Sequence, residues 1–376
     1  MLPAPYVISD IYWTYVQIIE TTSRYGATVL EEGNPAGTAR RGRRQHARVT
    51  IADVAREAGV GTTTVSRVIR NVDPISAETR KIVEAAIKKT GYTPNLLAGS
   101  LASATSKLIG VVVPSTRTLI FLDLLHGIRK ELRGTEFKLI VVETEYDVAS
   151  EEEIIRSLVG WKPAAIIIMG LDHSPGTEKL LKDYPGRVIE VMDLDGTPID
   201  TAIGFSNDAA GALTLQHLIS RGYKRFAYVG HAMAWDIRGR KRFLGMTRTL
   251  AENGLAFVTT HFSDKSSTVA MGRQATEDIR TLYPDVDVII YVNDTVALGG
   301  LFYCMSQGIR VPEDVALFGF NPIEMSQEIP TPIATIDNHP LDIGAAAAKE
   351  AISSAKRPKQ PRKIDTGLSL VTGATA

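Results

Sequence analysis

The chain has 376 residues, of which 44% are hydrophobic and 22% are charged, and it contains one cysteine. This length supports two or three domains with a large buried core, and a single cysteine excludes an internal disulfide framework and a cysteine-rich metal site. The net charge of zero hides an asymmetry: residues 40–107 carry thirteen Lys and Arg against five Asp and Glu, whereas residues 108–376 carry 28 against 33.

Residues 1–45 do not show the pattern of a folded domain. An aromatic patch, IYWTYVQII, is followed by EEGNPAGTA, which predicts a poorly ordered extension. Its basic tract, residues 39–48, either lies along phosphates or is a solvated linker. The N-terminus has no basic region ahead of an apolar segment, and no apolar run reaches the roughly 18 residues that span a bilayer. We therefore expect a cytoplasmic protein without a membrane segment.

Residues 46–92 carry the pattern of three short helices. Thr50 is a good N-cap for the first, Asp53 lies three residues further on, and Gly59 ends the helix. One apolar face recurs at helical spacing: Ile51, Val54, Ala55 and Ala58. Because this region belongs to the segment with a net charge of +8, it is expected to bind a polyanion.

The second helix, in GVGTTTVSRVIRN, begins with three threonines, which are poor helix formers. Their combined deficit against alanine is roughly 2 kcal/mol. The helix is therefore expected to depend on its apolar face, which consists of Val65, Val68 and Ile69. This leaves the first turn free for a purpose other than helix stability.

A third helix is expected after the N-cap Ser76, and Thr90 with Gly91 closes it. Its inward residues are expected to be Ile82, Val83, Ala86 and Ile87. Three short helices, the first two joined by a tight turn that contains glycine, predict a helix-turn-helix domain.

Residues 93–106 are rich in small and polar residues and include Pro94 and Gly99, so we expect a hinge helix that orders only with help. Beyond it, apolar runs such as LIGVVV, AAIIIM and VDVIIYV alternate with helical patterns. Continuous apolar runs are typical of strands buried on both faces of a parallel sheet. Residues 107–376 are therefore predicted to form a doubly wound α/β core of two subdomains with a cleft between them.

Three segments, VTIADVAREAGVGTTTVSRVIRN, ISAETRKIVEAAIKKTGYTPNLLAGSL and IGVVVPS, resemble the amino-terminal signature of the LacI/GalR family of bacterial transcription regulators. Within that family, VMDLDG, IGFSN, GLDHSPGT and YVNDTVALGG are most similar to repressors of gluconate and related sugar-acid operons. The resemblance implies a DNA-binding headpiece, a hinge helix, and a two-lobed core related to periplasmic sugar-binding proteins. It also implies a homodimer that binds palindromic operator DNA and a small sugar or sugar acid, with neither a cofactor nor a metal.

The resemblance assigns DNA contacts residue by residue. Base edges in the major groove fall to Thr62, Thr63 and Arg67, because threonine offers a hydroxyl and a methyl group and arginine can bind guanine bidentately. The phosphate contacts fall to Thr50, Thr64, Ser66, Ser76, Thr79, Tyr92 and Asn95. The alternative for the threonines is an ordinary polar surface turn.

Two hinge residues match the family's minor-groove contacts. Leu101 stands where family members insert a leucine into the operator centre, and Ala98 matches a small residue beside it. The alternative for Leu101 is packing against the core. Gly61 departs from the family, which usually has a hydroxyl N-cap there, so the second helix loses one cap.

Effector contacts are expected in the cleft. Asp294 follows a strand and matches an aspartate that binds sugar hydroxyls in relatives, although it could instead cap the helix that begins at Thr295. Arg242 matches a cleft-facing basic position and suits a carboxylate. Phe121 either stacks on the ligand or packs beneath a loop. The remaining candidates are Glu190, Asp193, Ser115 and His173. Asn321 stands where the family usually has an aspartate.

The sequence thus predicts a repressor of carbohydrate catabolism genes that is controlled by a small sugar or a sugar acid such as gluconate. One alternative is a solute-binding protein with the same core, against which the headpiece argues. Another is a corepressor-dependent regulator with a non-sugar ligand, which differs in the lobe arrangement that the ligand favours. A P-loop, a G-x-S-x-G elbow and His/Cys metal spacing are absent from the sequence, so we do not expect an enzyme.

Overall fold

The computed structural model describes residues 49–69, 74–93, 106–231, 236–264, 266–353 and 357–376. The chain divides into two compact units, Met1–Thr93 and Pro94–Ala376, and each has its own hydrophobic core. The expected N-terminal extension and residues 94–105 of the expected hinge lie outside the described residues.

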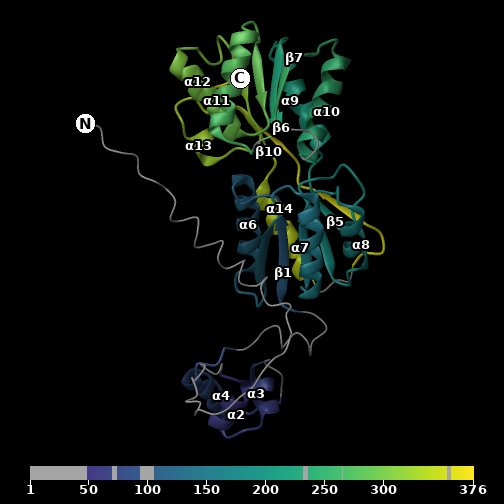
Figure 1. Ribbon diagram of the computed structural model, residues 1–376, viewed down its shortest axis with the longest axis vertical. Coiled ribbons are helices and arrows are strands. Elements are labelled where there is room, and N and C mark those ends of the chain that lie inside the picture. Colours follow the sequence, from purple (N-terminus) through teal and green to yellow (C-terminus); the bar gives the residue numbers. More distant parts are fainter. Residues whose placement is uncertain (1–48, 70–73, 94–105, 232–235, 265, 354–356) are drawn as a thin grey trace, which may run out of the picture. The chain divides into compact units, whose positions relative to one another are not determined.

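The first unit contains the three expected helices: α2 (Ile51–Ala58), α3 (Thr62–Ile69) and α4 (Ala77–Thr90) (Figure 1). The Thr50 amide donates to the Asp53 carboxylate at 2.9 Å, and Gly59 ends α2 with a φ of 65°, a conformation that suits glycine. Val54, Val65 and Val83, one from each helix, are fully buried together. The predicted apolar faces of α2 and α3 therefore form the core of this unit.

The prediction for α4 was wrong at one residue, because Ile82 is 46% exposed. Val83 and Ala86 are buried and Ile87 is half-buried, so these three residues define the inward direction of the helix. Ile82 lies about 90° around the helix from that direction, since successive residues are about 100° apart.

The second unit begins with an N-lobe built on one parallel sheet in the order β11-β5-β4-β3-β1-β2. Its strands are β1 (Leu108–Val113), β2 (Lys138–Glu143), β3 (Ala165–Met169), β4 (Arg187–Val191), β5 (Thr201–Gly204) and β11 (Arg362–Asp365). Its helices are α6 (Leu119–Leu132), α7 (Val148–Gly160), α8 (Pro175–Asp183) and α14 (Pro340–Ile352). Alternate residues of β1 explain the layers: Val111 packs with the core beneath α6 and α14, and Val112 with α7 and α8.

The C-lobe is built on a second parallel sheet in the order β7-β6-β8-β9, beside which β10 and β12 form an antiparallel pair. Its strands are β6 (Phe226–His231), β7 (Phe257–Ser263), β8 (Val288–Tyr291), β9 (Ala316–Phe318), β10 (Thr335–Asp337) and β12 (Ser369–Val371). Its helices are α9 (Asn207–Ser220), α10 (Ile237–Glu252), α11 (Val269–Leu282), α12 (Asp294–Gln307) and α13 (Glu324–Gln327).

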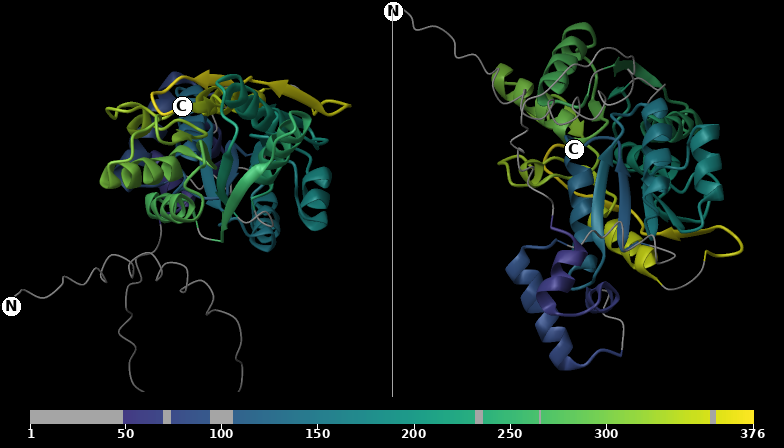
Figure 2. Two further views of the ribbon diagram at one scale, coloured as in Figure 1. Left: turned by 90° about the horizontal axis from the view of Figure 1, so that it is seen from above. Right: turned by 60° about the horizontal axis from the view of Figure 1, so that its bottom comes forward.

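The chain passes between the lobes three times: from β5 to α9, from β10 to α14, and from β11 to β12. Figures 1 and 2 show the last of these crossings as the yellow C-terminal segment. In each sheet the first strand of the lobe has its next two strands on opposite sides, β2 and β3 for β1, and β7 and β8 for β6. Ligands of open α/β sheets bind at the carboxyl ends of the strands at such switch points. The predicted fold class, a helix-turn-helix headpiece with a two-lobed doubly wound core, is confirmed.

Helices α9 and α10 approach each other closely through glycines. A Cβ atom at Gly211 would lie 2.0 Å from the Arg242 carbonyl oxygen, and one at Gly245 would lie 2.2 Å from the carbonyl oxygen of Asp208. Only residues without a side chain allow this contact. It packs the start of α9 against the middle of α10, with the two helices antiparallel. In the described part of the chain, no helix is long and apolar enough to cross a membrane.

Candidate functional site

The second helix of the first unit presents the residues that were assigned to base contacts. Val65 and Val68 are buried, whereas Thr62, Thr63 and Arg67 are exposed. No described residue forms a hydrogen bond or an ion pair with the Arg67 guanidinium. The helix begins directly after Gly61, whose carbonyl oxygen accepts from the amides of Thr64 and Val65. The exposed face of α3 can therefore enter a groove without breaking contacts inside the unit.

The residues assigned to phosphate contacts surround this helix. Thr50 and Ser76 are exposed at the starts of α2 and α4, and Thr64, Ser66, Thr79 and Tyr92 are half-buried. The Ser76 hydroxyl accepts from the Thr79 amide at 3.1 Å and so caps α4 as predicted. Helix N-termini attract anions, which suits phosphate binding at these caps. The remaining assigned residues, Asn95, Ala98 and Leu101, lie outside the described residues.

A cavity of about 490 Å³, here called the central cavity, lies at the switch point of the C-lobe sheet. His231 at the end of β6 and Asn293 just after β8 contribute to its lining. Both side chains bind the Ser267 hydroxyl, at 2.7 and 2.6 Å respectively. The other lining residues are Thr118, Ile120, Phe121, Tyr146, Met192, Phe205, Asn207, Asp236, Arg238, Arg242, Ser267, Val292, Phe320, Asn321 and Asn338.

Two of the expected effector residues, Phe121 and Arg242, line the central cavity. The Arg242 guanidinium lies 4.2 Å from the centroid of the Phe320 ring and donates to the Asn207 side-chain oxygen at 2.8 Å. It has no carboxylate partner among the described residues. This cation is thus fixed by stacking and by one neutral hydrogen bond, and its charge is left for a ligand.

Other features of the lining also indicate a binding site. The side-chain oxygens of Asn321 and Asn338 are buried without a hydrogen-bond partner among the described residues, which is rare unless something else supplies the donor. Tyr146, Met192 and Asn321 have φ values of 63°, 68° and 65°, in the left-handed region that non-glycine residues seldom adopt. Strained backbone of this kind concentrates at ligand sites.

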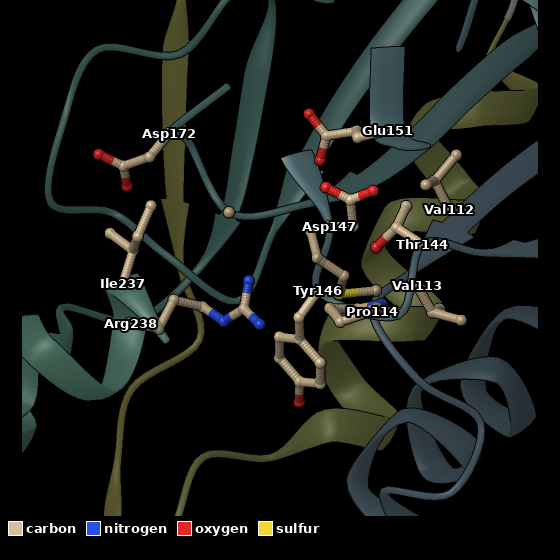
Figure 3. Close-up of a pocket in the computed structure, with 12 residues that line it drawn as sticks. Val112, Val113, Pro114, Thr144, Tyr146, Asp147, Glu151, Asp172, Ile237 and Arg238 are labelled. Carbon is tan, nitrogen blue, oxygen red and sulfur yellow. The ribbon is translucent and has the colours of Figure 1, made fainter. Parts of the chain in front are cut away.

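A second cavity, here called the side cavity, lies at the switch point of the N-lobe sheet, where β1 and β3 end (Figure 3). Its empty volume is about 560 Å³. Tyr146 and Arg238 line both cavities, so the two are neighbours. Figure 3 shows the Arg238 guanidinium pointing toward Tyr146, whose ring points away from the carboxylates of Asp147 and Glu151.

The other five effector candidates do not line either cavity. Asp294 is fully buried, and its carboxylate accepts hydrogen bonds from Thr335 at 2.7 Å and from Ser326. Burial raises its pKa to about 7, although these hydrogen bonds lower it. Its neighbour Asn293 lines the cavity instead and accepts from the Val296 amide as the N-cap of α12. Asn293, not Asp294, is therefore the N-cap of α12.

His173 and Glu190 line neither cavity, because the two side chains are buried against each other. His173 binds Glu151 at 2.9 Å through Nδ1, and its Nε2 lies 3.6 Å from Glu190. Glu190 also accepts from the Ile199 amide at 2.6 Å. Burial lowers the pKa of His173, but Glu151 and Glu190 together raise it to about 9. The cluster ties α7 to the loops that follow β3 and β4.

This cluster predicts a loss of stability at high pH. The folded-state pKa of His173 lies above its ordinary value of 6.5, so the stabilisation is complete below pH 6.5 and is lost as the pH rises through 9. The full effect is on the order of 3 kcal/mol. Thermal melting of the full chain between pH 6 and 9.5 should show a larger decrease for the wild type than for His173→Gln. Equal slopes for the two proteins would contradict the assignment.

Asp193 does not line either cavity, because its carboxylate forms an ion pair with Lys241 instead. The Lys241 ammonium on α10 of the C-lobe lies 2.5 Å from Asp193 and 2.6 Å from Asp172, and it donates to the Asp195 carbonyl at 3.0 Å. All three acceptors follow N-lobe strands, so we call this group the Lys241 bridge. Ser115, the last candidate, accepts from the Arg117 amide at 3.2 Å in the loop after β1.

The sequence reasoning missed Tyr146, Arg238, Asn207 and Asn338, which line the central cavity. Position after a strand was the signal that could have found Tyr146, since it follows β2. Arg238 lies in a run of basic residues, Arg238 to Arg242, and such a run predicts solvated helix surface. In the described part of the chain, no group of three or more His, Cys, Asp or Glu side chains is arranged to hold a metal ion.

Comparison with known proteins identifies both units. Residues 50–95 match the family model described as bacterial regulatory proteins, lacI family. Residues 106–366 match the model for periplasmic binding proteins and the sugar binding domain of the LacI family.

Similar proteins are regulators. The HTH-type transcriptional regulator GntR of Pseudomonas aeruginosa is 30% identical over 330 residues, 86% of this chain and 94% of that protein. GntR of Escherichia coli is 28% identical and is covered over 98% of its length. A crystal structure of a LacI family transcriptional regulator from Silicibacter pomeroyi has a TM-score of 0.81 and 36% identity, over 87% of this chain and 99% of that one.

A helix-turn-helix unit joined to a two-lobed ligand-binding core defines a DNA-binding transcription regulator. The matches cover both units, and the larger one spans more than half of the chain. The chain belongs to the LacI family of bacterial regulatory proteins.

Proposed function

We propose that this regulator is a homodimeric repressor of carbohydrate catabolism genes, that it binds a palindromic operator, and that a sugar acid controls it. On this proposal it acts in the cytoplasm and by binding rather than by catalysis. The observation that carries the proposal is the central cavity, where Arg238 and Arg242 provide two positive charges and Asp236 provides one negative charge.

An excess of one positive charge fits one carboxylate. Neither guanidinium forms an ion pair with a described residue, and Arg242 is held in place by Phe320. The amides of Asn207, Asn293, Asn321 and Asn338 offer donors and acceptors for hydroxyl groups, and Phe121 and Phe205 offer apolar faces for a carbon chain. The segments VMDLDG, IGFSN, GLDHSPGT and YVNDTVALGG, which resemble repressors of gluconate and related sugar-acid operons, support the same class of effector.

On DNA, we assign Thr62, Thr63 and Arg67 to the bases, since they form the exposed face of α3. The phosphate roles stay with the hydroxyl and aromatic residues that surround that face. The lac repressor dimer, solved bound to operator and the anti-inducer ONPF, shares the fold with a TM-score of 0.74 at 24% identity. Its operator-bound dimer supports this mode of binding as a proposal for the present chain.

Dimerisation is supported by exposed apolar surface on the core. Leu122 on α6 is 44% exposed and Val141 on the edge strand β2 is 39% exposed, and both line one surface groove. On the C-lobe, Phe302 and Met305 of α12 are also exposed. Apolar surface of this kind on both lobes favours a partner that spans them, as a second copy of the chain would.

Effector and operator affinities are coupled through the lobes on this proposal. The central cavity is lined from both lobes, so a ligand there favours the lobe arrangement that encloses it. Whatever shift the effector causes in operator affinity, the operator causes the same shift in effector affinity. On this proposal, a change in the lobe arrangement couples effector binding in the cavity to DNA binding by the headpiece of each protomer.

The test is calorimetric titration and thermal melting of the full chain with D-gluconate, related hexonates, and the neutral sugars glucose and galactose. We expect hexonates to bind and to stabilise the protein, and we expect the same compounds to change operator affinity in a gel-shift assay. If neutral sugars alone stabilise the protein, the effector is not a sugar acid. If hexonates bind without any change in operator affinity, the regulatory coupling is wrong.

The Lys241 bridge predicts how closure contributes to binding. Lys241→Met leaves the buried Asp193 without its counterion and removes the link from α10 to Asp172, so the closed arrangement loses population. If the fraction of molecules in the closed arrangement decreases tenfold, the apparent Kd for the effector increases about tenfold. Operator affinity should shift in the direction opposite to the effector's own effect. Lys182→Met removes an exposed ion pair with Glu178 and serves as the control. Equal effector affinities in the two variants would show that the Lys241 bridge does not contribute to effector binding.

A further inference from the structure

The two cavities differ in charge. The central cavity has a net charge of +1 from its lining side chains, because Arg238 and Arg242 outnumber Asp236. The side cavity is lined by Asp147, Glu151 and Asp172, and Arg238 is the one basic side chain in its lining. Since the two share Arg238 and Tyr146, the cleft is positive in the central cavity and becomes negative toward the N-lobe.

The carboxylates of the side cavity keep oxygens that can accept from a ligand. Glu151 binds His173 through Oε1, and Asp172 binds Lys241 through Oδ2, while no described residue donates to the second oxygen of either. Arg238 bonds to neither group, since it forms no hydrogen bond or ion pair with a described residue. These free oxygens suit hydroxyl donors. Glu151 is paired with His173 and Asp172 with Lys241, but each cation is shared with a second carboxylate, that of Glu190 or Asp193. The group therefore keeps a net negative charge and repels a second anion.

Taking the proposed sugar-acid function as given, we infer that the cleft binds the acid in one direction and selects against a charged tail. The carboxylate lies in the central cavity, against the guanidinium groups of Arg242 and Arg238. The polyhydroxyl tail extends past Tyr146 toward Glu151 and Asp172. An acid that ends in a hydroxyl group is accepted, whereas one that ends in a second carboxylate or a phosphate is rejected.

The choice of direction follows from the positions of the charges. In the reverse direction, the carboxylate of a monoacid would lie among three carboxylates, and the tail would leave the Arg242 charge unpaired in a buried site. Both changes are unfavourable, because like charges repel more strongly away from water. For a diacid, one end meets the acidic lining in either direction. Selectivity against diacids is therefore a property of the cleft as a whole.

D-gluconate and D-glucarate form a matched pair of probes, since they differ only in the last carbon, a primary alcohol in one and a carboxylate in the other. We expect calorimetric titration of the full chain to give at least 30-fold weaker binding for glucarate. Glu151→Gln and Asp172→Asn each remove one negative charge from the side cavity, so each should reduce that ratio about fivefold or more. Glu152→Gln is the control, because Glu152 is the next residue of α7, binds Arg156 and Ser174, and lines neither cavity.

The outcomes separate this inference from the proposed function. If gluconate and glucarate bind equally well, the charge selection is wrong and the sugar-acid function stands. If the ratio is large but neither Glu151→Gln nor Asp172→Asn changes it, the side cavity does not cause it and the inference is overturned. If neither acid binds while a neutral sugar does, the proposed effector class is wrong and the inference falls with it. A ratio that decreases in both variants and not in Glu152→Gln supports the inference.

Discussion

Replacing Arg242 with methionine is expected to weaken gluconate binding by about two orders of magnitude, since a hydrogen bond to a charged group contributes about 1.5–3 kcal/mol and the ligand carboxylate would lose its main partner. Methionine keeps part of the apolar contact with Phe320 but has no charge. Arg242→Lys should recover only part of the affinity, because an ammonium group cannot both stack flat on Phe320 and donate to Asn207. Calorimetric titration of the three proteins measures this.

Arg240→Met is the matched control. Arg240 lies two residues earlier on α10, is exposed, and lines neither cavity. It should bind gluconate as the wild type does, and its loss of charge is the same. Gluconate affinity within fivefold of the wild type in Arg242→Met would show that the carboxylate binds elsewhere. Arg238, which has no ion-pair partner among the described residues, would then be the first alternative.

The headpiece could be predicted from the sequence because its interactions are local. The first two helices follow from a capping threonine, a terminal glycine and apolar residues at helical spacing, and their cores match Val54, Ala55, Val65 and Val68. Ile82 was assigned inward with Val83, Ala86 and Ile87, although only the last three share the buried side of α4. The local sequence pattern predicts where the helix lies, but it does not predict how many of its apolar residues are buried.

The location of the cleft could be predicted from the sequence, but most of the side chains that line it could not. Continuous apolar strands identified parallel sheets, and hence the strand ends where ligands bind. Which polar side chain points into the cavity depends on distant partners: Asp193 turns to Lys241, 48 residues away, and Asp294 turns to Thr335, 41 residues away. The spacing of residues along the sequence does not reveal partners this far apart. Lining residues that the sequence did not point to, such as Arg238 and Asn338, come from elements that only the topology brings together.

The same polar contacts connect the cavity to the lobe interface. Arg242 donates to the Asn207 side chain, whose amide group bonds to the Met192 carbonyl at 3.1 Å and to Asp193 at 3.3 Å. Asp193 in turn binds Lys241. A ligand that pulls on Arg242 therefore acts on a continuous chain of hydrogen bonds that ends in the Lys241 bridge. This gives the proposed coupling between effector and lobe closure a physical route that variants at either end can test.

Arg67→Gln is expected to weaken operator binding by about 10- to 100-fold, because a bidentate arginine–guanine pair contributes about 1–3 kcal/mol of discrimination. The helix itself should be unaffected, since Arg67 is exposed and Val65 and Val68 hold α3 in the core. Fluorescence anisotropy at a fixed salt concentration, with operator and with random DNA of equal length, measures the effect. Salt must be fixed because phosphate contacts depend strongly on it.

Lys88→Gln separates base reading from charge. Lys88 is exposed on α4 and has none of the assigned DNA roles, so its replacement removes one positive charge of the same unit without touching α3. We expect it to weaken operator and random DNA alike and only slightly, whereas Arg67→Gln should affect the operator far more than random DNA. At the operator position that faces Arg67, the variant should no longer bind guanine in preference to the other bases. If Arg67→Gln weakens both DNAs equally, Arg67 contacts a phosphate, and Thr62 and Thr63 remain as the base-reading residues of the helix.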